Sequence, residues 1–133
     1  IRLGKDYLMD TRDIPATSMG KVRERDKAGW LALFAEDATV EDPVGPSAWD
    51  PEGRGRRGKA EIAAFYDMFS AAQTGFAFEI REMYTCGDEV AAAVSMHIIG
   101  LDGTRHTTSA INVYRRSPDG LIQSLRSFWE AQV

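Results

Sequence analysis

The second half of the chain is a series of alternating apolar and polar runs separated by turn signals, and this pattern constrains the fold most. The runs cover residues 76–84, 90–99, 104–115 and 121–130. Alternation of this kind is typical of β-strands that bury one face. Asp102-Gly103 favours a two-residue hairpin between the second and third runs, and Ser117–Gly120 favours a longer turn before the fourth. We therefore expect an antiparallel meander.

The first half of the chain has helical periodicity instead. We predict one helix from about residue 14, with Pro15 in its first turn, a second over 27–35 capped by Asp26, and a third over 59–70. The apolar residues of the third helix recur at helical spacing and should face the core: Ile62, Phe65, Tyr66 and Phe69. Helices followed by an antiparallel meander give an α+β fold.

Composition limits the domain count and the partners. A chain of 133 residues that is 44% hydrophobic has room for one domain, which we place at 14–133, after a polar N-terminal extension at 1–13. The net charge of -4 argues against nucleic acid or an anionic membrane as partner. No apolar run approaches the ~20 residues that span a bilayer. With Cys86 as the single cysteine, no intrachain disulfide forms, and we expect a cytoplasmic protein.

One acidic residue lies where an apolar side chain belongs. If 38–42 is extended, Ala38, Val40 and Asp42 share the face that looks buried. Pro43 supports the extended conformation, because the residue before a proline is disfavoured in a helix. An unpaired carboxylate buried there would cost several kcal/mol or have a raised pKa. Asp42 therefore caps a helix, pairs with an arginine, or has a function.

The hairpin signal also predicts which side chains share a face. A two-residue turn at Asp102-Gly103 pairs Leu101 with Thr104, which places one polar but nearly uncharged set on the same face: Ala93, Ser95, His97, Ile99, Thr108, Ala110, Asn112 and Tyr114. The opposite face would carry Val94, Met96, Ile98, Ile111 and Val113. We expect the polar-dotted face to enclose a ligand and the apolar face to pair two subunits as a homodimer.

Three segments carry a resemblance to a known family. They are residues 33–45, with Glu41-Asp42-Pro43, then 58–66, and 120–129. In these segments the chain resembles the ketosteroid isomerases of the NTF2-like, or SnoaL-like, superfamily, over roughly residues 14–130. The resemblance implies a cone of about three N-terminal helices packed on a strongly curved antiparallel sheet that encloses an apolar pocket.

The resemblance also implies a site. In those isomerases the aspartate of the motif, here Asp42, is the general base. A tyrosine on the first helix and a protonated aspartic acid on a late strand stabilise the dienolate. Ungapped alignment places Ser18 and Asn112 at those two positions, so the oxyanion hole is altered. An asparagine amide still donates to an oxyanion. The resemblance also matches Tyr66 to a supporting tyrosine and Trp129 to an aromatic residue of the pocket wall. From their positions in the predicted elements we expect Ser18, Val40, Phe69 and His97 to contact the substrate as well.

Several of these residues also have structural interpretations. Asn112 could satisfy backbone groups at a strand end, His97 could be a hydrogen-bonded core histidine, and His106, near the hairpin end, should be exposed. We predict no metal site, because His97 and His106 have no evident third ligand. Residues 53–58 match a dinucleotide fingerprint in letters, but without a parallel βαβ unit they are better explained as a loop at the pocket rim.

These observations favour a cofactor-free steroid Δ5-isomerase-like protein that binds a steroid-like or polycyclic hydrophobic molecule, with proton transfer by Asp42. Two alternatives use the same fold. One is a non-catalytic protein that binds a hydrophobic ligand, and the other is a SnoaL-like cyclase, dehydratase or hydrolase acting on another substrate.

Overall fold

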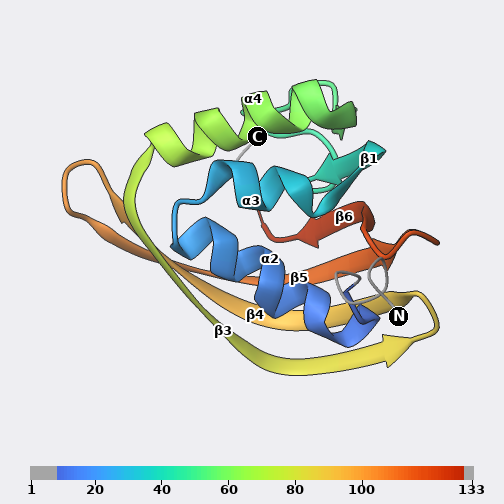
Figure 1. Ribbon diagram of the computed structural model, residues 1–133. Helices are drawn as coiled ribbons and strands as arrows, with labels where there is room; N and C mark the ends of the chain where they lie inside the picture. Colours follow the sequence, from blue (N-terminus) through green and yellow to red (C-terminus); the bar gives the residue numbers. More distant parts are fainter. Residues whose placement is uncertain (1–8, 131–133) are drawn as a thin grey trace.

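A computed structural model of the protein describes residues 9–130, and Figure 1 shows its helices gathered on one side of a curved sheet. The helices are the 3-10 turn η1 (Thr11–Asp13), α2 (Ile14–Arg23), α3 (Lys27–Ala32) and α4 (Gly58–Ala71). The strands are β1 (Phe34–Glu41), β2 (Arg56–Arg57), β3 (Gln73–Cys86), β4 (Glu89–Gly100), β5 (Arg105–Arg116) and β6 (Ile122–Phe128). The expected α+β fold is confirmed.

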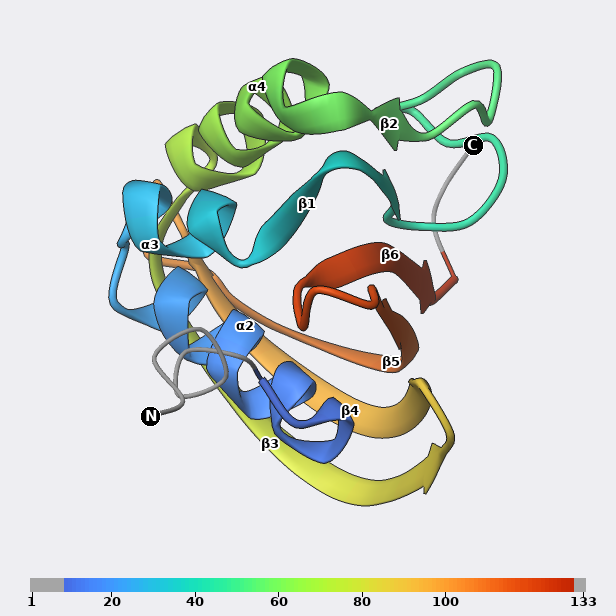
Figure 2. The same cartoon turned by 45° about the vertical axis from the view of Figure 1, so that its right-hand side comes forward.

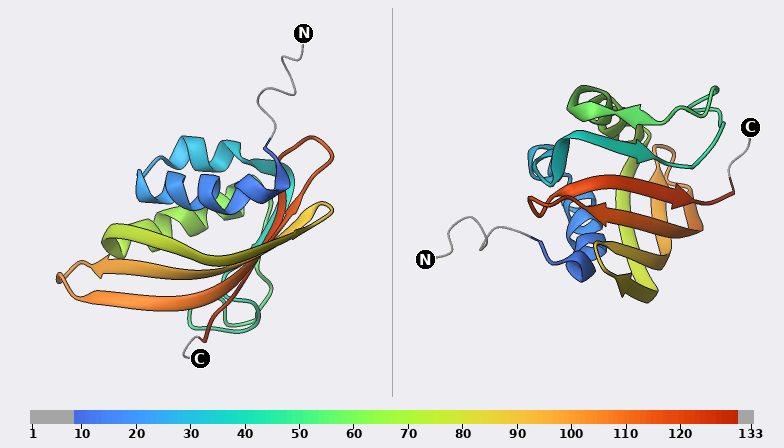
Figure 3. Two further views of the ribbon diagram at one scale, coloured as in Figure 1. Left: turned by 90° about the horizontal axis from the view of Figure 1, so that it is seen from below. Right: turned by 90° about the vertical axis from the view of Figure 1, so that its right-hand side faces the viewer.

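The six strands form one sheet in the order β2-β1-β6-β5-β4-β3. The long strands β3, β4 and β5 are an antiparallel meander that bends around the helices (Figure 2). One departure from the expected antiparallel sheet is that β1 runs parallel to its neighbour β6. Seen from below, all three α-helices lie on the same side of the sheet (Figure 3, left). The sheet and the helices together give the predicted cone.

The helix starts follow the sequence signals, whereas one helix end does not. Pro15 lies in the first turn of α2, and the Asp26 carboxylate accepts a hydrogen bond from the Gly29 N–H at 2.8 Å, which caps α3. We expected α3 to reach residue 35, but it ends at Ala32. The Leu33 carbonyl accepts a hydrogen bond from Ile122 N at 2.7 Å. Strand pairing with β6 therefore replaces the helix at this point.

The core lies between the helices and the concave face of the sheet. It contains Trp30 of α3, and Ile62, Phe65 and Tyr66 of α4, with Phe69 packed against it. These α4 residues are the face that helical spacing predicted. Part of the predicted extension also docks, because the Met9 carbonyl accepts a hydrogen bond from Arg116 Nε at 2.6 Å. Residues 1–8 of that extension lie outside the described residues.

The predicted register between β4 and β5 is wrong by one residue. The hairpin loop has three residues, Leu101 to Gly103, because Gly100 pairs with Thr104 through an N–H···O bond of 2.8 Å. Gly103 supplies a positive φ of 83° that this longer loop uses. Since side chains alternate along a strand, the shift turns β4 over relative to the prediction. Asn112 is therefore opposite Ala92, not Ala93.

The shift changes which residues cover each face. Val94, predicted on the outer face, is fully buried beneath the helices, and Met96 and Ile98 line the concave side with it. Only Ile111 and Val113 of the predicted apolar outer face remain outside. The outer face is consequently more polar than the prediction, with Ser95 and His97 on β4.

Candidate functional site

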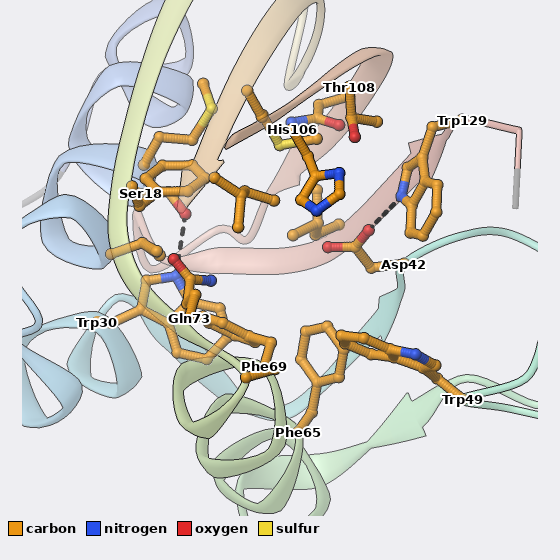
Figure 4. Close-up of a pocket in the computed structure, with 18 of the residues that line it drawn as sticks. Ser18, Trp30, Asp42, Trp49, Phe65, Phe69, Gln73, His106, Thr108 and Trp129 are labelled. Carbon is orange, nitrogen blue, oxygen red and sulfur yellow. Dashed lines mark hydrogen bonds between the residues drawn. The ribbon is translucent and has the colours of Figure 1, made fainter. Parts of the chain in front are cut away.

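The helices and the concave face of the sheet enclose a largely apolar cavity of about 330 Å³. Its wall comes from α2, α3, α4, the strands β3 to β6, and the segment 42–49 that follows β1. This volume lies at the lower end of the range for small-molecule sites. Figure 4 shows the polar groups of Asp42, Ser18 and His106 among aromatic rings. A cavity of this kind suits a hydrophobic ligand with few polar groups.

Asp42 is the acid of this cavity, and a single indole holds it. It follows the last residue of β1, where Ala38 and Val40 point into the core at 0% and 1% exposure. Strand alternation therefore carries the carboxylate inward, as the sequence predicted. The Trp129 Nε1–H donates to Asp42 Oδ1 at 2.6 Å (Figure 4). Glu41, the preceding acid, points away from the cavity and pairs with Arg126 at 3.0 Å.

The environment of Asp42 changes its acidity. Burial raises the pKa of Asp42 above its ordinary value, while the hydrogen bond from Trp129, the nearby Ser127 hydroxyl and the positive charge of Arg56 oppose that rise. The net shift is upward, so burial is the larger effect. A carboxylate with a raised pKa is a stronger base than an exposed one. This arrangement suits proton abstraction.

A polar cluster on β5, β6 and α2 faces the same cavity. Asn112 is 4% exposed, and its Oδ1 accepts a hydrogen bond from the Ser127 hydroxyl at 2.5 Å. Because Oδ1 is engaged, the amide is oriented and its two N–H groups point elsewhere. Ser18 of α2 also lines the cavity, where its Oγ accepts a hydrogen bond from Trp30 Nε1 at 3.2 Å. The site thus combines one acid with several neutral donors.

Of the other residues that we expected at the substrate, Phe69 and Trp129 line the cavity. Val40 and Tyr66 belong instead to the hydrophobic core. The Tyr66 ring packs against Phe69, with ring centroids 5.0 Å apart. Val40 and Tyr66 are therefore placed to support the cavity wall.

The prediction that His97 contacts the substrate is wrong. His97 lies on the outer face of β4, where its ring nitrogens hydrogen-bond Glu79 Oε1 at 2.8 Å and Thr107 Oγ1 at 2.9 Å. The one-residue shift in register explains the error, because it exchanges the two faces of β4. His106 is exposed, as we expected, yet it also lines the cavity.

Within residues 9–130, no group of three histidine, cysteine, aspartate or glutamate side chains is arranged to hold a metal ion. The described helices include none that is long and apolar enough to cross a membrane.

Comparison with known proteins identifies the family. A SnoaL-like domain model matches residues 19–125, which include Asp42 and all but the ends of the fold. The chain belongs to the SnoaL-like family. In this NTF2-like fold the helices and curved sheet enclose the cavity described above. A steroid Delta-isomerase of Nocardioides simplex is 32% identical over 103 residues, covering 77% of this chain and 75% of that protein.

Solved structures of SnoaL-like relatives agree with this assignment. A Δ5-3-ketosteroid isomerase from Mycobacterium sp. superposes with a TM-score of 0.82 at 32% identity, over 90% of this chain and 92% of that one. A Mycobacterium tuberculosis protein in complex with estradiol-17beta-hemisuccinate superposes with a TM-score of 0.83 at 31% identity, over 92% and 95% of the two chains. Both the fold and the resemblance inferred from the sequence are confirmed.

The SnoaL-like cavity also uses residues that sequence reasoning missed. Trp49 lies in the loop after β1, and Gln73 begins β3, so neither belongs to a periodic pattern that could have marked it. Tyr114 lines the cavity as well. This residue was not missed, because strand alternation placed it two residues after Asn112 on the face that we expected to enclose a ligand.

Proposed function

We propose that this protein isomerises a Δ5-3-ketosteroid or a similar polycyclic ketone, with Asp42 as the base. The observation that carries the proposal is the Asp42 carboxylate itself. It is held at 2.6 Å by Trp129 in an apolar cavity, and its pKa is raised. The relatives that are named steroid isomerases at 32% identity support the choice of substrate.

The reaction needs one proton carrier and one place for negative charge. Asp42 takes a proton from carbon 4, between the ketone and the double bond, and the electron pair moves through carbon 3 onto the ketone oxygen. The neutral Asp42 then gives the proton to carbon 6, and the double bond moves into conjugation with the re-formed ketone. We propose that the Asn112 amide donates to the oxyanion of the dienolate. No proton is lost or gained overall, and the sequence of steps needs no cofactor.

An ultraviolet assay for the conjugated enone tests the proposal, together with steroid binding measured by calorimetry. We expect the wild type to produce the conjugated ketone and Asp42→Asn to bind the same steroid without producing it. Tight binding without turnover by the wild type would replace the isomerase with a steroid-binding protein. If the protein bound no steroid, the proposal would be contradicted, and a cyclase, dehydratase or hydrolase acting on another substrate would be favoured.

We further propose that two copies pair through the outer face of the sheet. Ile111 and Phe128 are cross-strand partners there and are 44% and 40% exposed, which leaves an apolar patch. Sedimentation of the wild type should show a dimer that Ile111→Glu converts to a monomer. A monomeric wild type at micromolar concentration would contradict the proposal.

A further inference from the structure

Tyr114 is a buried polar residue of the cavity that the steps above leave without a task. It is 1% exposed, lies on β5 two residues beyond Asn112, and lines the same cavity as Asp42. The family's tyrosine belongs on the first helix, where this chain has Ser18. Ser18 lines the cavity too. The cavity therefore contains a phenol, but the phenol comes from a different element.

Two polar side chains that can donate hydrogen bonds affect the Tyr114 hydroxyl. They are Ser18 and Asn112, and both lower the pKa of the phenol. Asn112 Oδ1 already accepts from Ser127, so the amide has its N–H groups left to offer. The Ser18 oxygen already accepts from Trp30, which leaves its O–H to donate. The Ser18 hydroxyl and the Asn112 N–H groups are thus available to donate to the phenol oxygen, which leaves the phenol proton for an acceptor in the cavity.

The electrostatic surroundings keep this phenol neutral. Burial raises the pKa of Tyr114 far above its ordinary value, and the charge of Asp42 raises it further, whereas Ser18 and Asn112 lower it. A phenol that stays protonated at every working pH donates a hydrogen bond without competing with Asp42 for the proton. When Ser18 and Asn112 donate to its oxygen, its O–H bond is also polarised.

We propose that the Tyr114 hydroxyl is a catalytic hydrogen-bond donor to the oxyanion of the bound substrate. From strand β5 it takes the role that the resemblance gives to a tyrosine on the first helix, where this chain has Ser18. The inference rests on the proposed isomerisation, because the oxyanion forms only when Asp42 removes a proton. It assigns the ketone end of the ligand to the part of the cavity beside Ser18, Asn112 and Tyr114.

The test compares Tyr114→Phe with Tyr84→Phe, a matched removal of a tyrosine hydroxyl at a position that is 69% exposed and outside the cavity. Turnover of the Δ5-3-ketosteroid is measured alongside the dissociation constants of estradiol, whose phenol mimics the dienolate, and of the same steroid without its 3-oxygen. We expect Tyr114→Phe to lower kcat by about 10²–10³ and to weaken estradiol about tenfold, with the 3-deoxy steroid unaffected. Tyr84→Phe should change none of these values.

Two results would overturn the assignment. One is turnover by Tyr114→Phe within about threefold of the wild type, since losing an oxyanion donor costs far more than this. The other is an equal loss of affinity for the 3-deoxy steroid, which would indicate a general packing defect. If the wild type does not turn over the ketosteroid but Tyr114→Phe selectively weakens estradiol, the proposed reaction fails while the donor role of Tyr114 stands.

A second measurement covers the case in which Tyr114→Phe does not fold. In wild-type protein labelled with fluorotyrosine, the fluorine resonance of residue 114 should move when estradiol binds and stay in place with the 3-deoxy steroid. Equal shifts with both steroids, or no shift with either, would contradict a hydrogen bond to the 3-oxygen.

Discussion

Replacing Trp129 by phenylalanine removes the hydrogen bond that holds the Asp42 carboxylate and keeps most of the aromatic wall. The bond joins the indole Nε1 to Asp42 Oδ1 at 2.6 Å, and it favours the charged form of the acid. Hydrogen bonds to charged groups contribute about 1.5–3 kcal/mol, and one pKa unit corresponds to about 1.4 kcal/mol. We therefore expect Trp129→Phe to raise the pKa of Asp42 by roughly one to two units.

The assay is the pH dependence of kcat/KM for a Δ5-3-ketosteroid, which reports the pKa of the base in the free enzyme. In the wild type the rate should fall on acidification, with a midpoint above the ordinary aspartate value of about 3.9, because burial raises the pKa of Asp42. In Trp129→Phe the same acid limb should lie at higher pH. On acidification the variant would therefore lose activity at a higher pH than the wild type does.

Trp49→Phe is the matched control. Trp49 also lines the cavity, but it is not the donor to Asp42 in the hydrogen bond described above. This variant should alter KM through the changed wall and leave the midpoint of the acid limb where it is. If the limb of Trp129→Phe also stayed at the wild-type pH, the reasoning that Trp129 stabilises the ionised base would be refuted.

Three further predictions concern Asp42, Asn112 and the core. At neutral pH, Asp42→Asn should raise the melting temperature, because a carboxylate whose pKa is raised by folding destabilises the folded state when it is ionised. The gain in melting temperature should vanish below about pH 4, where the wild-type acid is protonated in the folded and the unfolded state alike. Asn112→Asp should raise kcat about tenfold, because burial keeps such an acid neutral and a carboxylic acid is a stronger donor than an amide, and an unchanged or lower kcat would contradict the donor role. Ile62→Val, at a fully buried site, should cost about 0.5–1.5 kcal/mol in urea unfolding, and an unchanged free energy of unfolding would contradict its place in the core.

The fold was readable from the sequence because its signals are local. Pro15 and Asp26 mark helix starts through the chemistry of capping, and the apolar spacing of α4 identifies its buried face. Strand alternation alone was enough to place Asp42 inside the cavity. Each of these inferences needs only a few neighbouring residues, so errors elsewhere do not spread to it.

The register of the hairpin between β4 and β5 could not be predicted from local signals alone. Asp102-Gly103 is compatible with a two-residue or a three-residue loop, and the choice between them decides the face of every β4 side chain. The folded chain has the three-residue loop, because the register that this loop gives buries Val94 against the helices. His97 was therefore assigned to the wrong face, although the neighbouring strand β5 was placed correctly.

Cavity residues in irregular segments, and contacts between distant segments, also could not be predicted from the sequence. Trp49 reaches the cavity from a loop without periodicity. The position of Ser18 beside Tyr114 depends on how α2 crosses the sheet, which no spacing in either segment encodes. Sequence comparison therefore identified a missing tyrosine at Ser18, and the packing of α2 on β5 was needed to find the phenol beside it.

The claim that Asp42 is the base is tested most directly by the ratio of kcat/KM for Asp42→Asn to that of the wild type, with Glu41→Gln as control. Glu41 is the adjacent acid, it pairs with Arg126 at 3.0 Å, and it points away from the cavity. We predict a loss of about 10²–10⁴ for Asp42→Asn and a value close to the wild type for Glu41→Gln. Equal activities in Asp42→Asn and the wild type would contradict the account.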